Sequence, residues 1–171
     1  REGRRFGGWA GDGEAARGVI LGVDGSNIRD GGGVTHLVEL LGAAEPDRAG
    51  FSRVVVWTGG AVRRRIEERP WLQKHEEPLL EKGLLHRTYW QRFRLSKLAR
   101  RARCDVLLVP GGAFAGDFRP TVTMSQTLLP FDTEEKKRFG WSLMRVKLEV
   151  MRVVQARAFR RSAGLVFLTE H

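Results

Sequence analysis

Short apolar runs recur along the chain, and longer segments with helical spacing separate them. The clearest runs lie at residues 19–23, 54–57, 105–109, 121–125 and 165–168. Because these runs are mainly apolar rather than alternating, they predict strands that are buried on both faces of a sheet. Such strands, alternating with helices, are typical of a doubly wound α/β fold. The sequence therefore predicts a Rossmann-like parallel sheet with helices on both faces.

The spacing of apolar residues predicts helices between most of these strands. We expect helices over about residues 34–44, 61–68, 93–103 and 133–161, the last with a break near Gly140. Pro70 is expected to end the second of them. Residues 84–86 are interpreted as a further short strand.

Length and the two ends of the chain suggest its domain organisation. A chain of 171 residues and 19.3 kDa suits one domain, or one half of a two-domain enzyme. Residues 1–18 hold few apolar side chains, so we expect a disordered lead-in to one domain over residues 19–171. The chain starts without methionine and stops directly after an apolar run. We therefore interpret it as the N-terminal part of a longer protein.

Cysteine and histidine usage bears on disulfides and metals. The single cysteine, Cys104, excludes an internal disulfide and a cysteine-based zinc site, and we expect it in the core. The histidines are far apart in the sequence, at positions 36, 75, 86 and 171, so no metal site is expected. His36 falls in the first turn of the first predicted helix, where it either faces a cleft or serves to cap or pack that helix.

Positive charge is in excess and gathers in two segments. The chain has 30 Lys and Arg against 20 Asp and Glu, a net charge of +10, which favours nucleic acid, a phosphorylated molecule or a membrane surface as partner. Residues 87–103 and 134–161 carry much of this excess. The second segment predicts either a helix that lies on an anionic membrane or one that packs on the sheet with a solvated basic face.

Membrane and nucleic-acid signals are limited. No apolar run approaches the roughly 18 residues of a membrane span, and no signal peptide is visible, so we expect a cytoplasmic protein that is either free or peripheral at the inner membrane face. Arginine and aromatic residues interleave over 86–94, which also suits nucleic acid. No recognised nucleic-acid motif accompanies them. Nucleic acid is therefore not expected as a partner, and a basic nucleic-acid-binding domain and a non-catalytic scaffold are kept as alternatives.

A glycine-rich loop follows the first predicted strand. Gly31, Gly32 and Gly33 stand at the start of a helix, where they let the backbone come close to an anion that faces the helix amides; the alternative is a tight turn only. The dinucleotide and P-loop patterns are both absent, so neither an NAD-type cofactor nor ATP hydrolysis is supported. In the same loop, Asp24 and Arg29 either reach a ligand or form a pair that stabilises the loop.

Neutral polar residues lie at two expected strand ends. Gln126 and Thr127 follow the strand at 121–125, and Asn27 follows the first strand. Gln126 and Thr127 either contact a ligand or only cap the strand. Together with Asn27 they are the hydrogen-bonding side chains that an acceptor pocket needs.

Three segments, in this order, resemble glycosyltransferase family 4, whose GT-B fold has two facing Rossmann-like domains. The first is the strand, glycine loop and helix of residues 19–41. The second is Asp-Val-Leu-Leu-Val-Pro at 105–110, and the third spans 121–170, with Ser-Gln-Thr-Leu-Leu-Pro-Phe, a basic helix and Ala-Gly-Leu-Val-Phe-Leu-Thr-Glu. The resemblance covers residues 19–171.

The resemblance implies a retaining transfer of a sugar from a nucleotide-sugar to a sugar or lipid-linked acceptor, with no cofactor and no obligatory metal. This chain would be the acceptor-binding half, inactive alone, and the catalytic residues of the donor site would lie in the absent second domain. Gly31, Gly32 and Gly33 would approach the donor phosphates. Many family members have a His-Asp pair where this chain has Gln126-Thr127. Gln cannot act as a general base, so only hydrogen bonding to a hydroxyl is expected there.

Overall fold

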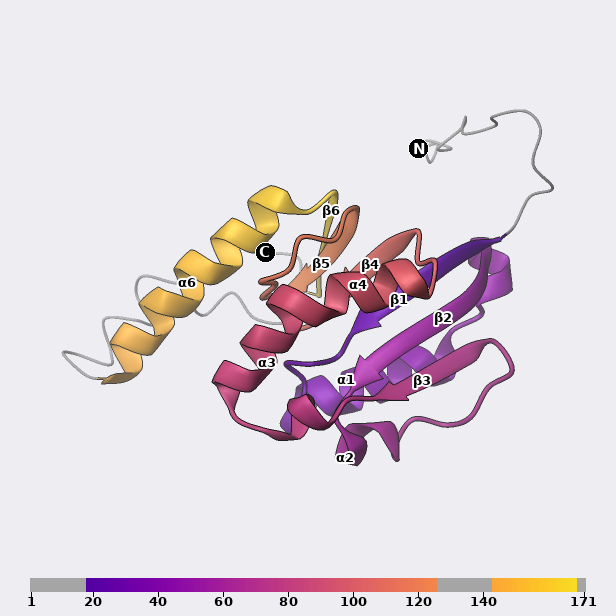
Figure 1. Cartoon of the computed structure of the whole chain (residues 1–171), viewed down its shortest axis with the longest axis horizontal. Coiled ribbons are helices and arrows are strands. Elements are labelled where there is room, and N and C mark those ends of the chain that lie inside the picture. The colour runs from indigo at the N-terminus through magenta and orange to yellow at the C-terminus, as the bar shows by residue number, and fades with distance from the viewer. Residues whose placement is uncertain (1–17, 126–142, 169–171) are drawn as a thin grey trace.

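The described part of the protein forms a sheet of six parallel strands. The computed structural model describes residues 18–125 and 143–168, and the strand order is β3-β2-β1-β4-β5-β6 (Figure 1). The strands are β1 Val19–Asp24, β2 Phe51–Thr58, β3 Leu72–Glu76, β4 Val106–Val109, β5 Thr121–Ser125 and β6 Gly164–Phe167. This is the order of a doubly wound Rossmann-like sheet, so the predicted fold class is confirmed. The expected lead-in, apart from Gly18, lies outside the described residues.

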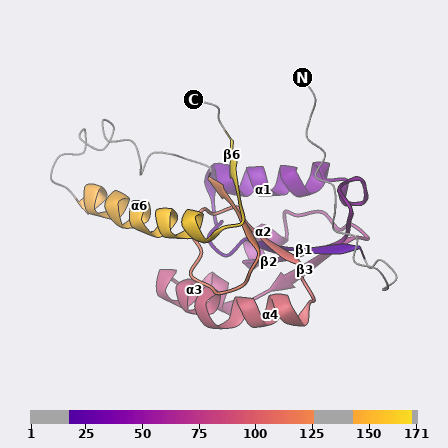
Figure 2. The same ribbon diagram turned by 90° about the horizontal axis from the view of Figure 1, so that it is seen from above.

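Helices cover both faces of the sheet. They are α1 Gly31–Ala43, α2 Gly60–Arg63, α3 Leu84–Trp90, α4 Ser96–Arg101 and α6 Leu143–Arg161, with the π-helical turn η3 Gln91–Leu95 between α3 and α4 and the 3-10 turns η1 Pro46–Ala49 and η2 Pro78–Glu81. Figure 2 shows α1 on one face of the sheet and α3 and α4 on the other. Of the helices in the described part of the chain, none combines the length and apolar character that crossing a bilayer requires.

The alternation of side chains along β2 divides the core into two clusters. Val54 and Val56 point to the face that α1 covers, while Val55 and Trp57 point to the face covered by α3, η3 and α4. From the helices, the first cluster receives Val34, Leu37, Leu41 and Val62, and the second Trp90, Leu95 and Ala99. Both faces of the central strands are therefore buried, as their apolar runs predict.

Cys104 packs in the second of these clusters, as expected for a small core residue. Burial raises the pKa of its thiol to about 11.

The predicted strand at 84–86 is wrong, because these residues begin α3. A helical stretch starts at Leu84, and its buried face holds Trp90, Leu95 and Ala99. Residues 84–86 form the exposed first turn of this stretch rather than a strand. The third strand is β3, which the sequence analysis missed. Among the described strands β3 pairs with β2 alone, at the sheet edge, and Leu72 is its single aliphatic residue, which is typical of an edge strand.

Three helix predictions change in extent. The helix expected at 93–103 is the end of a helical stretch that runs from Leu84 to Arg101 through α3, η3 and α4. The helix expected at 61–68 is the four-residue α2, Gly60–Arg63, and a turn follows it before Pro70. Of the helix expected at 133–161, the described part is α6, Leu143–Arg161, so the break expected near Gly140 lies outside the described residues.

The substitution Leu37→Ala is expected to lower the free energy of unfolding by about 2–5 kcal/mol, because Leu37 is 0% exposed and its loss leaves a cavity under α1. The control is Leu85→Ala on α3, where the leucine is 83% exposed and the expected loss is below about 0.5 kcal/mol. Urea denaturation of both variants measures the difference. Equal losses would contradict the assignment of α1 to the core.

Candidate functional site

The carboxyl ends of β1 and β4 meet at the topological switch point of the sheet. The chain leaves β1 toward β2 on one side and leaves β4 toward β5 on the other, because the order is β3-β2-β1-β4-β5-β6. In open α/β sheets the crevice between two such loops is the usual ligand site. The loops here are residues 25–30 and 110–120.

Asp24, the last residue of β1, is held in a buried network. It is 1% exposed, its Oδ1 accepts the backbone N–H of Ser26 at 3.1 Å, and its Oδ2 accepts Nε2 of Gln91 at 2.5 Å. Arg29 does not pair with it but donates to the carbonyl oxygen of Glu81 at 3.4 Å. The pair expected between Asp24 and Arg29 is therefore wrong, and Asp24 stabilises the loop through Ser26 and Gln91 instead.

Gln91 connects the two switch-point loops to η3. Its Nε2 also lies 3.0 Å from Oγ of Ser26 and 3.3 Å from the carbonyl oxygen of Ala113, and its Oε1 accepts the N–H of Ala115 at 3.4 Å. Sequence reasoning missed this residue. The available signal was a polar side chain at a position that helical spacing assigns to the buried face, next to Trp90.

Burial sets the ionisation of Asp24. Removal of the carboxyl group from water raises its pKa above the ordinary 3.8, and the hydrogen bonds from Ser26 and Gln91 offset only part of this effect. A raised pKa in the folded state means that ionised Asp24 costs stability. The stabilising contribution of protonated Asp24 is fully present below the pKa that this carboxyl group has in the unfolded chain. It is lost as the pH rises through the higher pKa of Asp24 in the folded state.

The substitution Asp24→Asn removes this titration. We expect the difference in unfolding free energy, wild-type minus variant, to fall as the pH rises from about 4, and then to become constant. Urea denaturation of both proteins across pH 4 to about 8 measures this difference, which cancels the titration of other groups. A difference that rises with pH would contradict the account, because it would mean that the site stabilises the carboxylate.

The substitution Gln91→Met tests the same site from the other side. It deletes the side-chain amide of Gln91, whose hydrogen bond lowers the pKa of Asp24. In the variant the pKa of Asp24 should therefore be higher, and the fall in unfolding free energy should extend to higher pH than in wild-type. An unchanged pH profile would show that Gln91 does not act on this carboxyl group.

The three glycines stand at the open start of α1, on the carboxyl side of β1. Gly31 has φ +62°, in the left-handed region that favours glycine, and Asp30 makes no side-chain cap. Apart from the chain neighbours and the backbone of α1 itself, no described residue lies within 4 Å of a Cβ atom built at Gly31 or Gly32. Both glycines are exposed, while Gly33 is half-buried. The surface at Gly31 and Gly32 is therefore open among the described residues, at a helix start whose first N–H groups have no partner within the helix, as an anion site requires.

Asn27 lies between the two switch-point loops. Its Nδ2 donates to the carbonyl oxygen of Ala113 at 3.3 Å, and a Cβ atom built at Gly111 would stand 3.0 Å from its Cβ. Asn27 therefore joins the glycine loop to the loop after β4. Gln126 and Thr127, the other expected acceptor contacts, lie outside the described residues, which reach Ser125 at the carboxyl end of β5.

Two arginines add positive charge beside the glycine loop. Arg87 of α3 places NH1 3.5 Å from the carbonyl oxygen of Ser26. Burial, with a smaller effect from the neighbouring charge of Arg29, lowers the pKa of the Arg87 guanidinium. Arg87 was noticed in the sequence only as part of a basic segment. Its position depends on a contact across 61 residues, which no local pattern reveals.

In the described part of the chain, no group of three or more His, Cys, Asp or Glu side chains is arranged to hold a metal ion. His36 is half-buried on α1, and its Nε2 is buried without a hydrogen-bond partner among the described residues.

Comparisons with models of known protein families, with curated proteins and with solved structures find no match to this chain.

Proposed function

We propose that this chain is the acceptor-side domain of a retaining glycosyltransferase that takes its sugar from a nucleotide-sugar. The resemblance of residues 19–171 to glycosyltransferase family 4 suggests this activity. In the proposal, the donor phosphates approach Gly31, Gly32 and Gly33, and the acceptor contacts Asn27, Gln126 and Thr127. The donor-site residues belong to a second domain, and the protein is cytoplasmic.

The observation that carries the proposal is the open start of α1 at the switch point. Gly31 and Gly32 are exposed and uncapped, and no described side chain covers them. Arg87 and Arg29 add positive charge to the same loop. A helix N-terminus with nearby cations is a favourable place for phosphate oxygens.

The chemistry of sugar transfer fits this arrangement. When the bond between the sugar and the nucleotide breaks, the departing diphosphate gains negative charge. Backbone amides already fixed in the first turn of α1 stabilise that charge without reorganising, so they favour the transition state over the ground state. The Asp24–Gln91 contact supports this function indirectly, because it fixes the loop that leads into α1.

Nucleic-acid binding is a second candidate, and one exposed cluster favours it. The rings of Tyr89 and Phe93 lie 5.0 Å apart on α3 and η3, and the guanidinium of Arg92 lies 5.5 Å from the centre of the Phe93 ring. Exposed aromatic rings with arginine can stack bases. Salt-dependent binding of an oligonucleotide, without turnover of any nucleotide-sugar, would favour this candidate over sugar transfer.

Sugar transfer is tested on the intact gene product, because the proposal assigns the donor residues to a second domain. We expect release of a nucleoside diphosphate from at least one nucleotide-sugar, and an anomeric configuration retained in the product by NMR. Absence of turnover with every donor would contradict the proposal.

The substitution Gly32→Ala tests the role of the glycine turn. A methyl group there meets no described atom, so the fold should gain up to about 1 kcal/mol from the better helix former. The same methyl group stands over the first turn of α1 and should obstruct one amide–phosphate contact. Such a contact is worth about 1–1.5 kcal/mol, so kcat/KM should fall about five- to tenfold.

Gly42→Ala is the matched control. Gly42 is also exposed on α1, has no described neighbour within 4 Å of a built Cβ, and lies at the opposite end of the helix. The control should gain stability in the same way and keep full activity. Equal activity of the two variants would contradict a role of the turn in holding the diphosphate.

A further inference from the structure

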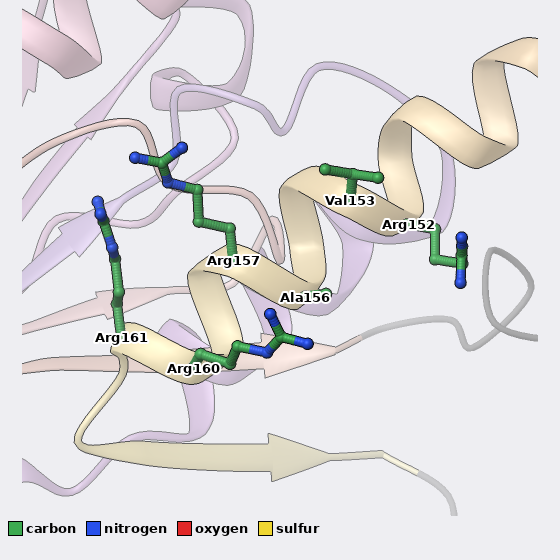
Figure 3. A pocket seen from close by; sticks show the side chains of 6 residues that line it. All are labelled: Arg152, Val153, Ala156, Arg157, Arg160 and Arg161. Carbon is green, nitrogen blue, oxygen red and sulfur yellow. The ribbon is translucent and has the colours of Figure 1, made fainter.

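The surface beside α6 contains two hollows that share the same two arginines. One hollow, of about 630 Å³, is lined among the described residues by α6 alone, and Figure 3 shows Arg157 and Arg161 extending from one side of that helix. The second hollow, of about 420 Å³, lies between α6, η3 and the loop that leads into β5. Its volume falls within the range of roughly 300–1,000 Å³ typical of small-molecule sites.

Four arginines line the second hollow, which we call the arginine cavity: Arg92, Arg119, Arg157 and Arg161. Arg92 comes from η3, Arg119 from the loop before β5, and the other two from α6. Phe114 and Val154 supply apolar wall between them. Three separate segments therefore bring cations to one concave place, unlike a solvated face of a single helix.

Among the described residues, few carboxylates neutralise the charges in the arginine cavity. Arg92, Arg157 and Arg161 form no ion pair with a carboxylate of the described residues. Arg157 and Arg161 are four residues apart on α6, where like charges repel and destabilise the helix. An anion in the cavity would relieve this repulsion.

The acidic residue in the wall, Asp117, has its own partners. Its carboxylate pairs with Arg100, which is outside the cavity lining, at 3.7 Å. A hydrogen bond with Ser96, the charge of Arg100 and, with a smaller effect, the charge of Arg92 lower the pKa of Asp117, so it is ionised at neutral pH and offsets part of the charge of Arg92. Arg119 is oriented by a 2.6 Å hydrogen bond from NH1 to the carbonyl oxygen of Phe118.

We propose that the arginine cavity binds a phosphate oxyanion, either a phosphate monoester or a diphosphate group, with the organic part of the ligand against Phe114 and Val154. Guanidinium groups match phosphate because their planar array of donors bonds two oxygens at once. The phosphate could belong to a soluble molecule or to a lipid headgroup, which present the same chemistry to the arginines.

The arginine cavity is separate from the glycine turn, so this inference goes beyond the proposed sugar transfer. The cavity is lined by the chain just before β5 and by the last turns of α6, whereas the glycine turn follows the carboxyl end of β1. The two sites adjoin through one loop, since Ala115 lines the cavity and its N–H donates to Gln91 of the switch-point network.

Isothermal titration of the chain with inorganic pyrophosphate at low ionic strength tests the cavity directly. We expect measurable binding that weakens at least about tenfold in the double variant Arg157→Gln/Arg161→Gln, because charge-assisted hydrogen bonds are lost. The control Arg64→Gln/Arg65→Gln removes the same charge from exposed arginines that follow α2. It should bind as wild-type does. Equal weakening of pyrophosphate binding in both double variants would overturn the proposal. The proposal would also fail if the wild-type chain bound neither pyrophosphate nor the vesicles described below.

Two further single variants sharpen the result. Asp117→Asn removes the acidic wall residue without removing a cation, and should tighten pyrophosphate binding about two- to fivefold. In Gly32→Ala, the pyrophosphate binding that depends on Arg157 and Arg161 should remain, whereas any binding at the glycine turn should weaken. Failure of the glycine turn and failure of the cavity therefore give different results. Weaker binding in Asp117→Asn would contradict the assigned electrostatics.

Co-sedimentation with vesicles distinguishes the sources of the phosphate. Binding to phosphatidylcholine vesicles only when they contain phosphatidic acid, with loss in Arg157→Gln/Arg161→Gln but not in the control, would identify a lipid headgroup. Pyrophosphate binding without vesicle binding would identify a soluble phosphorylated ligand. Binding of a single-stranded oligonucleotide in place of both would overturn the proposal and assign the patch to nucleic acid.

Discussion

The hydrogen bond from the Gln91 amide to the buried Asp24 carboxylate holds the switch point together. It joins the end of β1 to η3, and the same amide reaches the loop after β4 through Ala113 and Ala115. A buried carboxyl group without such partners would be strongly destabilising, so the network is needed wherever Asp24 is kept. The position of the glycine turn, and with it the proposed function, depends on this contact.

Two features that we propose as anion sites adjoin that network. The glycine turn presents backbone amides at the start of α1, whereas the arginine cavity presents side-chain guanidinium groups beside α6. Amides fixed by the helix suit a charge that develops during a reaction. Flexible arginines suit a phosphate that is already charged when it binds. Four of the arginines that contribute to the net charge of +10 therefore line one concave surface, the arginine cavity.

The fold class could be predicted from the sequence because strands that are buried on both faces appear as continuous apolar runs. The runs around Val54 and Leu107 predict central strands, and both lie in the core. β3 was not predicted because an edge strand needs few apolar residues, and β3 has one aliphatic residue, Leu72. The exposed run at Leu84 and Leu85 was mistaken for a strand because hydrophobicity alone does not reveal whether a segment is buried.

The candidate site was less accessible from sequence. The glycine turn and Asn27 were found because they follow a strand within a few residues, which is a local signal. Gln91 and Arg87 were not found, because each contacts Ser26 in the loop after β1, which is more than sixty residues away in the sequence. Such pairings arise only when the α3–η3 segment packs against the sheet.

The central claim is that the amides of the glycine turn face a nucleoside diphosphate. Backbone amide NMR of the ¹⁵N-labelled protein during titration with a nucleoside diphosphate tests it most directly. The account predicts saturable shifts that are largest at Gly31, Gly32 and Gly33, with Gly42 unmoved at the far end of the same helix. Saturable shifts that leave these three amides untouched would contradict it.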